Sequence, residues 1–269
     1  MECVFSSADR ALAFRLEAAE AANGLAIARA ANNHNPAATA QPFAGGTAVF
    51  GGVGSPMTHA LGIGLKGPVA SSELAEMEAF FRDRGSACLI DLCPMADESV
   101  ISYVQSNPYR VIEFNNVLAR RIDPSEHFEI PPTIRPVAKR DDDLRRWATV
   151  VAHGFSEGAA ANAEMIDTIA GSCGESICFE AGEGEPQAGA AMGIQGSVAL
   201  FYGDATLVSG RRQGWQSALI RARLAAARDL ACDLAMVSVL PGSGSHRNYE
   251  GAGFQLIYMR VNLTREFTT

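Results

Sequence analysis

The chain has 269 residues, of which 48% are hydrophobic and 19% are charged, a composition typical of a globular protein large enough for two domains. The formal net charge of −8 argues against a broad electrostatic surface for DNA or RNA, which needs a basic face. No apolar run approaches the roughly 18 residues of a membrane span, and the first residues lack the basic and apolar regions of a secretion signal. We therefore expect a cytoplasmic protein that binds neither nucleic acid nor a membrane.

The first half of the chain predicts a long helix followed by alternating strands and helices. An alanine-rich stretch has a rough apolar face at helical spacing and ends at the cluster Asn32–Pro36. In chain order we predict a helix over 9–31, glycine-punctuated strands within 47–65, a helix capped by Ser71 and Ser72 and stopped at Gly85, a strand over 87–92, a helix over 97–106 and a strand over 110–118.

The pattern breaks over Asp123–Pro136, which contains four prolines and no periodicity. Such a stretch is typical of an interdomain linker, so we predict domains at 1–130 and 131–269. The second series then comprises a strand over 134–137, helices over 141–152 and 163–170, a hairpin of strands 176–181 and 187–194, a strand over 198–208, a helix over 214–230, a strand over 234–240, a short helix over 246–250 and a strand over 254–261. This mixture indicates an α+β fold, with helices layered on a sheet. The similar order of elements in the two halves suggests a tandem repeat.

Two cysteine pairs share one spacing, Cys88/Cys93 and Cys173/Cys178. A zinc site usually brings two to four residues between paired cysteines and a second pair or histidines nearby. Here four residues separate each pair and no histidine follows closely. We expect buried, reduced thiols and no metal site.

The most informative segment is Leu207–Leu219, where a long predicted strand meets a helix through a short polar loop. Unpaired backbone N–H groups at a helix N-terminus, with the positive end of the helix dipole behind them, suit a phosphate group. Gly214 lets the backbone approach a ligand closely. Arg211 and Arg212 are disfavoured at a helix N-terminus unless an anion lies between them. A solvated arginine pair on a turn is the alternative.

This loop resembles motif A of the GNAT acyltransferases, whose pattern is R/Q-x-x-G-x-G/A. The sequence gives Arg211-Arg212-Gln213-Gly214-Trp215-Gln216, so Gln216 stands where the pattern has a small residue. Downstream, Tyr249, Gly253 and Phe254 match the Y-x-x-x-G-F ending of the family. The similarity extends from about 134 to 261 and is specific over the last 70 or so residues.

The resemblance implies an N-acyltransferase that uses acetyl-CoA or another acyl-CoA. It implies that the CoA pyrophosphate meets the backbone of 211–217, that the strand end pairs with pantetheine, and that Tyr249 is the general acid that protonates the CoA thiolate. A packed aromatic side chain is the alternative for Tyr249. The cofactor-binding residues carried over are Leu207, Val208, Arg211, Arg212, Gln213, Gly214, Trp215, Gln216, Ser217, Ser245 and Asn248.

The sequence does not identify the general base. The long strand that often carries an acid in this family offers Leu200, Phe201 and Tyr202, with Asp204 further along. Glu157 and Glu164 precede the first hairpin and are further candidates. Each carboxylate is more often a surface group, and water can serve where the acceptor amine is weakly basic.

A second glycine pattern lies in the first half, where residues 62–67 spell G-x-G-x-x-G and Asp91 follows. A dinucleotide-binding fold needs this loop between a strand and a helix, but Pro68 stands where the helix should already run. The better interpretation is a degenerate GNAT-like half, with the strand over 57–65 and the helix over 72–84 matching those over 198–208 and 214–230. It lacks an arginine-rich phosphate loop, so we expect it to bind no acyl-CoA.

The predicted function is transfer of an acyl group to an amine, either a small molecule or a peptide. Two alternatives remain open from the sequence. A non-catalytic acyl-CoA-binding or sensing protein would keep the phosphate loop without a base. A dinucleotide-dependent oxidoreductase would bind NAD(H) instead. The acceptor and the oligomeric state are not determined.

Overall fold

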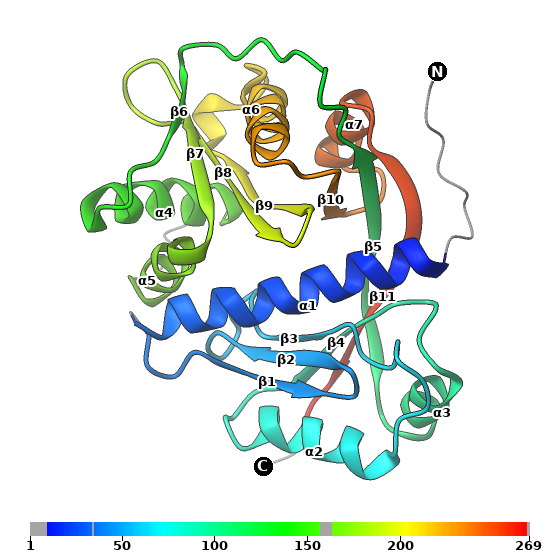
Figure 1. Cartoon of the computed structure of the whole chain (residues 1–269). Coiled ribbons are helices and arrows are strands. Elements are labelled where there is room, and N and C mark those ends of the chain that lie inside the picture. The colour runs from blue at the N-terminus through cyan, green and yellow to red at the C-terminus, as the bar shows by residue number, and fades with distance from the viewer. Residues whose placement is uncertain (1–9, 34, 157–162, 268–269) are drawn as a thin grey trace.

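A computed structural model describes residues 10–33, 35–156 and 163–267 (Figure 1). Within these residues the strands form one eleven-stranded sheet in the order β1-β2-β3-β4-β11-β5-β10-β9-β8-β7-β6. The strands are β1 (Thr39–Phe43), β2 (Gly46–Phe50), β3 (His59–Leu61), β4 (Cys88–Leu92), β5 (Arg110–Arg121), β6 (Ile134–Pro136), β7 (Ile177–Ala181), β8 (Ala188–Gln195), β9 (Val198–Thr206), β10 (Leu234–Val239) and β11 (Gln255–Arg265).

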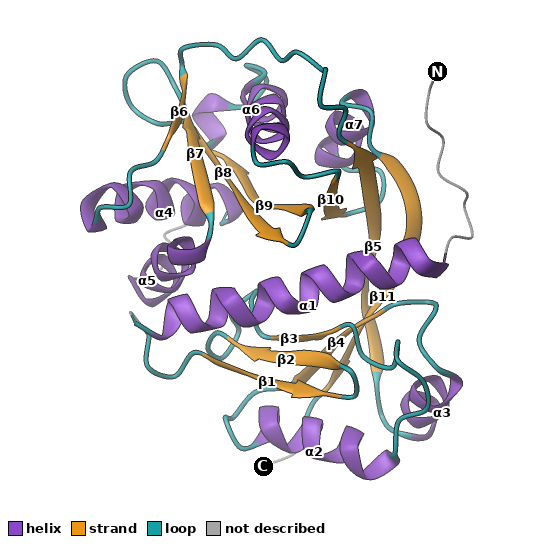
Figure 2. Ribbon diagram, viewed as in Figure 1, coloured by secondary structure: helices purple, strands orange, loops and turns teal. Residues whose placement is uncertain are grey.

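The helices of the described residues form two groups, one for each half of the chain, with the first helix lying between them (Figure 2). They are α1 (Arg10–Asn32), α2 (Ser71–Arg82), α3 (Glu98–Ser106), α4 (Asp141–Phe155), α5 (Ala163–Ser172), α6 (Trp215–Asp229) and α7 (Gly244–Gly251). The α+β fold predicted from the sequence is therefore confirmed.

The two halves exchange their last strands. The strand β5 ends the first half but pairs with β10 of the second half, Val117 lying opposite Ser238. The strand β11 ends the chain but pairs with β4 of the first half, Leu263 lying opposite Ile90. In Figure 1 both long strands run from one half into the other. The strands before and after Asp123–Thr133 thus belong to one continuous sheet, although this segment itself carries neither helix nor strand. The domain boundary between 130 and 131 stays a prediction.

Two strand pairs among the described residues are parallel, β3 with β4 and β9 with β10, and the other eight are antiparallel. Each parallel pair is joined by a crossover helix, α2 in the first half and α6 in the second. The predicted match between 57–65 and 198–208 therefore falls on equivalent strands. A mostly antiparallel sheet is also not the parallel sheet of a dinucleotide-binding fold.

The helix α1 lies across the middle of the molecule and packs against strands of both halves (Figure 1). Its Glu17 is fully buried and accepts hydrogen bonds from the Tyr258 hydroxyl and the Arg260 Nε, each at 2.7 Å. Arg260 also donates to the carboxylate of Glu20. These contacts fix α1 to β11, because a buried guanidinium separated from its carboxylates would be strongly unfavourable.

Several predicted boundaries need correction. The strand β1 was not predicted, because Pro42 and a short polar run obscure it; the strand lies at the sheet edge, where a proline is tolerated. The predicted strand over 57–65 narrows to three residues. Ser71 and Ser72 do not cap α2: its N-cap is Ala70, without a side-chain cap bond.

The five described cysteines are free and buried. Cys88 and Cys93 belong to different core clusters, and burial raises the pKa of each thiol to about 12. The Sγ atoms of Cys173 and Cys178 lie 2.7 Å apart. No group of three potential metal ligands occurs in the described part of the chain.

None of the helices over residues 10–33, 35–156 and 163–267 combines the length and the apolar character that crossing a membrane requires. The cytoplasmic location stays a prediction.

Candidate functional site

The parallel strands β9 and β10 diverge partway along their length. Their pairing ends at Phe201 and Val237, while β9 continues to Thr206. Gly203 adopts a φ of +68°, beside an irregularity in the pairing of β9 with β8. A bulge bends a strand and redirects its side chains. Beyond Phe201, the edge of β9 that faced β10 is therefore unpaired over 202–206 and open to an added strand. The glycine inside a long predicted strand was the sequence signal for this feature.

The helix α6 begins directly after the loop that follows β9. Its N-cap is Gly214, with a φ of +80° and no side-chain cap. A Cβ at Gly214 would meet nothing within 4 Å, so the approach to the helix end is open. Arg211, Arg212 and Gln213 are exposed on the same loop. In the described part of the chain, no backbone carbonyl accepts from the N–H groups of 215–217, which leaves them available for an anion.

The residue that departs from the motif, Gln216, connects α6 to α7. Its Nε2 donates to Ser245 Oγ at 2.8 Å, and its Oε1 accepts from Asn248 Nδ2 at 2.7 Å. A glycine or alanine at this position would make neither bond. The structure therefore brings three of the predicted cofactor-binding residues together at one helix end.

Two other predicted cofactor-binding residues, Leu207 and Val208, lie just beyond the unpaired edge of β9 and are not part of it. The Leu207 N–H already donates to the Gln187 carbonyl at 2.9 Å, and Val208 begins a 3-10 turn with its side chain 55% exposed. The unpaired edge of β9 lies just before them. Pairing of Leu207 and Val208 with pantetheine stays a prediction, and the geometry favours the preceding residues of β9.

Tyr249 of α7, Asp204 of β9 and Arg223 of α6 form a buried cluster. The Tyr249 hydroxyl donates to Asp204 Oδ2 at 2.8 Å, and Arg223 donates to the same oxygen and to the Tyr249 hydroxyl, each at 3.0 Å. Arg223 and Tyr249 are fully buried. Burial raises the pKa of Tyr249 well above its ordinary value, so the hydroxyl stays protonated at neutral pH. The role of Tyr249 as general acid stays a prediction.

A cavity of about 500 Å³ opens between the diverging strands and extends to the first half of the chain. Asp204 lines it, with Tyr249 directly behind; Tyr249 itself is not among the lining residues. Most of the wall is apolar. The polar and titratable side chains on it are Glu20, Asn23, His59, Asn115, Ser172, Tyr202, Asp204, Ser238, Ser243 and Ser245.

One wall of this cavity comes from the first half of the chain and was not predicted. His59 of β3 and Glu20 of α1 face the cavity, and Asp91 of β4 lies behind His59 with Oδ2 3.0 Å from Nδ1. The parallel pairing of β3 with β4, which places Leu61 opposite Asp91, brings this histidine and aspartate together. The residues around position 59 do not predict the contact between His59 and Asp91, because the two are 32 residues apart in the chain.

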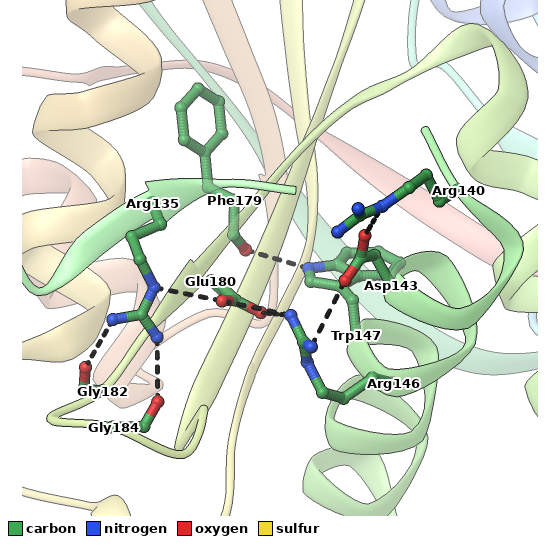
Figure 3. Close-up of polar contacts among 9 residues, drawn as sticks. All are labelled: Arg135, Arg140, Asp143, Arg146, Trp147, Phe179, Glu180, Gly182 and Gly184. Carbon is green, nitrogen blue, oxygen red and sulfur yellow. Dashed lines mark hydrogen bonds and ion pairs between the residues drawn. The ribbon is translucent and has the colours of Figure 1, made fainter. Parts of the chain in front are cut away.

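Another wall is formed by α4, which contributes Trp147, Val151 and Phe155. Figure 3 shows how the helix is fixed to the edge of the sheet. The Trp147 Nε1 donates to the Phe179 carbonyl at 2.9 Å, and the buried Glu180 carboxylate binds Arg135 and Arg146 on either side. These contacts hold an apolar wall rigidly against β7.

Of the carboxylates that the sequence offered as the general base, Asp204 is bound by Arg223 and Tyr249. The Tyr202 hydroxyl shares a 2.6 Å hydrogen bond with Ser176, and burial raises its pKa. Glu164 is exposed on α5 and Glu157 lies outside the described residues.

The first turn of α2, which corresponds to that of α6, contains an acidic residue. Glu73 in its first turn accepts from the Ala44 N–H at 2.6 Å. This bond ties the first turn of α2 to the turn between β1 and β2, and the absence of acyl-CoA binding by the first half stays a prediction.

No protein-family model matches the sequence, and no curated protein matches it. Solved structures do match. A GCN5-related N-acetyltransferase from Kribbella flavida is 14% identical, with a TM-score of 0.68 over 96% of both chains. A tandem GNAT protein from the clavulanic acid biosynthesis pathway, solved without AcCoA, is 13% identical, with a TM-score of 0.57 over 97% of both chains. A GCN5-related N-acetyltransferase from Sphaerobacter thermophilus is 15% identical, with a TM-score of 0.56 over 73% of this chain and 67% of that one. The fold is that of the GNAT proteins, in a tandem arrangement.

Proposed function

Because its structure has the GNAT fold, we propose that this chain is an N-acyltransferase that moves an acetyl or other acyl group from acyl-CoA to an amine by direct attack in a ternary complex. The carrying observation is the continuity of three features. The open N-terminus of α6 follows the unpaired edge of β9, and that edge opens into the cavity. Ser245 joins them, because it both lines the cavity and binds Gln216 of α6.

The described residues fit an acyl-CoA along this path. Open N–H groups at a helix N-terminus with two exposed arginines suit a pyrophosphate. The Trp215 side chain packs against the core cluster that contains Ile134, Phe179 and Leu219 and so fixes the first turn of α6 to the sheet. The free edge of β9 suits the amides of a pantetheine arm, which would bind as an added strand.

The cavity provides the place for the acceptor amine. Backbone N–H groups of β9 at the divergence would polarise the thioester carbonyl, since a donor aimed at developing charge stabilises the transition state. Tyr249 keeps its proton at neutral pH and is proposed to donate it to the leaving thiolate, with Asp204 and Arg223 holding its hydroxyl in place.

Calorimetric titration with acetyl-CoA tests this proposal. We expect binding of the wild type at about micromolar Kd and a loss of at least about tenfold in Gly214→Glu, because a carboxylate there repels the pyrophosphate. Gly196→Glu is the matched control: Gly196 also has a positive φ and open space at its Cβ, but lies in the turn between β8 and β9. No binding by the wild type at up to about millimolar acetyl-CoA would sink the proposal.

Release of CoA separates the enzyme from the non-catalytic alternative. Acetyl-CoA that is bound but never turned over with any amine, and never hydrolysed above background, would favour a binding or sensing protein. Steady CoA release would exclude it.

A further inference from the structure

The wall that the first half contributes to the cavity contains a histidine held by a carboxylate. We propose that His59, positioned by Asp91, is the general base that removes the proton from the acceptor amine. This inference rests on the proposed acyl transfer and assigns the one chemical role that the second half leaves unfilled. The degenerate half would then supply a catalytic group to a site whose cofactor-binding elements belong to the other half.

The geometry leaves one nitrogen of His59 free for this role. The Nδ1 faces Asp91 Oδ2 at 3.0 Å, and no hydrogen bond engages Nε2 among the described residues. The His59 side chain is 25% exposed and the Asp91 side chain 14%. A carboxylate on one ring nitrogen fixes the tautomer and the orientation of the ring, so the other nitrogen becomes the proton acceptor.

The other titratable groups on the cavity wall already have partners. Asp204 is bound by Arg223 and Tyr249. Glu20 is bound by Arg260, and Tyr202 by Ser176. The carboxylates of Glu20 and Asp204 are each ion-paired with a buried arginine, whereas Nε2 of His59 has no protein partner among the described residues.

The charges around His59 come from four elements. Asp91 on β4 and Glu20 on α1 favour the protonated imidazole, and Arg260 on β11 opposes it. Glu113 on β5 lines, with His59 and Asp91, a second hollow of about 270 Å³. Burial lowers the pKa of His59, while Asp91 and Glu20 raise it, and the net result is a pKa above its ordinary value. The neighbouring carboxylates therefore make His59 a stronger base than an ordinary imidazole.

The proposed step balances as follows. A primary ammonium group gives one proton to His59 Nε2, which makes the ring an imidazolium held by Asp91. The neutral nitrogen attacks the thioester carbonyl, so a C–N bond forms and the C–S bond breaks with sulfur leaving as thiolate. The nitrogen loses a second proton and the thiolate gains one, giving the N-acyl amide and the free thiol of CoA. The imidazolium then releases its proton to water.

The rest of the wall indicates the kind of amine to use as a probe. Trp147, Val151, Phe155, Ile169 and Leu61 make it largely apolar. Tryptamine and phenethylamine combine a primary amine with an apolar body and are the probes of choice.

The experiment measures CoA release from acetyl-CoA with each probe amine, from about pH 5 to 9, in the wild type, His59→Gln and Asp91→Asn. His127→Gln, an exposed histidine in the linker, is the control. We expect His59→Gln to lower kcat/KM by about 10²–10⁴-fold with the Kd of acetyl-CoA changed less than about twofold. In the wild type, kcat/KM should rise with pH through the pKa of His59, and the variant should lose this dependence.

Asp91→Asn keeps the imidazole, so it provides a second test in case His59→Gln loses activity only because it does not fold. Without the carboxylate the pKa of His59 falls, so the rising limb of the pH profile should move to lower pH while the plateau also falls. A purely structural role would lower the rate without moving the limb. A limb that does not move, or turnover by His59→Gln within about threefold of the wild type, would overturn the proposal.

Basal hydrolysis of acetyl-CoA without amine covers the case in which the wild type acylates neither probe, since a base on the cavity wall also activates water. Hydrolysis that is lower in His59→Gln supports the assignment, and equal hydrolysis overturns it. Failure of the wild type to bind acetyl-CoA is a different result, because it refutes the acyltransferase proposal itself.

Discussion

At the scale of single residues, the site contains buried polar groups that do not line the cavity themselves but bind a residue that does. Asp204 lines the cavity, while Tyr249 and Arg223 lie behind it and are fully buried. Three elements distant in sequence meet at this cluster. A buried polar group is stable only with its partners in place, so the cluster ties the shape of the cavity to the packing of α6 and α7.

Replacement of Tyr249 by phenylalanine tests its two roles together. The lost hydrogen bond to Asp204 should lower the free energy of unfolding by about 1–3 kcal/mol, measured by chemical denaturation. The lost proton donor should lower kcat by about 10²-fold or less, because a thiolate is a good leaving group. If Tyr249→Phe loses stability as expected but keeps the kcat of the wild type, the role of Tyr249 is structural and not catalytic. Tyr202→Phe, a cavity-wall tyrosine bonded to Ser176, is the control.

At the scale of elements, the contact between His59 and Asp91 joins β3 to β4 and makes their pairing sensitive to pH. The lowered pKa of Asp91, caused chiefly by His59 against the effect of burial, contributes stability above the ordinary carboxyl pKa that is lost as pH falls through the folded-state value. The raised pKa of His59 contributes stability at low pH that is lost as pH rises through its folded-state value. The two contributions overlap between these pKa values.

We therefore expect Asp91→Asn to reduce the free energy of unfolding most at mildly acidic pH, about 5 to 6, and less at about pH 9, because the imidazole loses its proton as pH rises through its folded-state pKa. Denaturation curves of the wild type and the variant at both values measure this difference. Asp97→Asn is a comparison at an N-cap, where the carboxylate pairs with Ser99 rather than a histidine; its effect should not shrink as pH rises to 9. A loss in Asp91→Asn that is the same at both pH values would contradict the ion pair.

At the scale of the whole molecule, the exchange of β5 and β11 makes each half depend on the other. The strand β11 lies between β4 and β5, both from the first half, and β5 separates it from β10. Without the first half, β11 would have no neighbour and β10 would expose an edge. Unpaired strand edges and apolar faces aggregate. The buried contact of Arg260 with Glu17 adds to this dependence.

A fragment of residues 131–269 should therefore not fold alone, although it contains the whole predicted acyl-CoA site. Circular dichroism and gel filtration should show an unfolded or aggregated chain, and co-expression with residues 1–130 should restore a folded complex that binds acetyl-CoA. The full chain should unfold in one cooperative transition. A fragment that folds alone and binds acetyl-CoA would show that the strand exchange is dispensable.

The sequence by itself determined features whose cause is local. The loop at Gly214, the long strand before it and the helix after it depend on chain neighbours, so the α+β class and the equivalence of the two halves follow from residue order. The tertiary structure alone decided which strands pair across the halves and which side chains meet. It placed Asp91 against His59, and Arg223 against Asp204 and Tyr249. It also made residues of the first half part of the wall of the cavity. These contacts join residues far apart in the chain, because the energy of burying and pairing them depends on the whole packed sheet, which no local pattern contains.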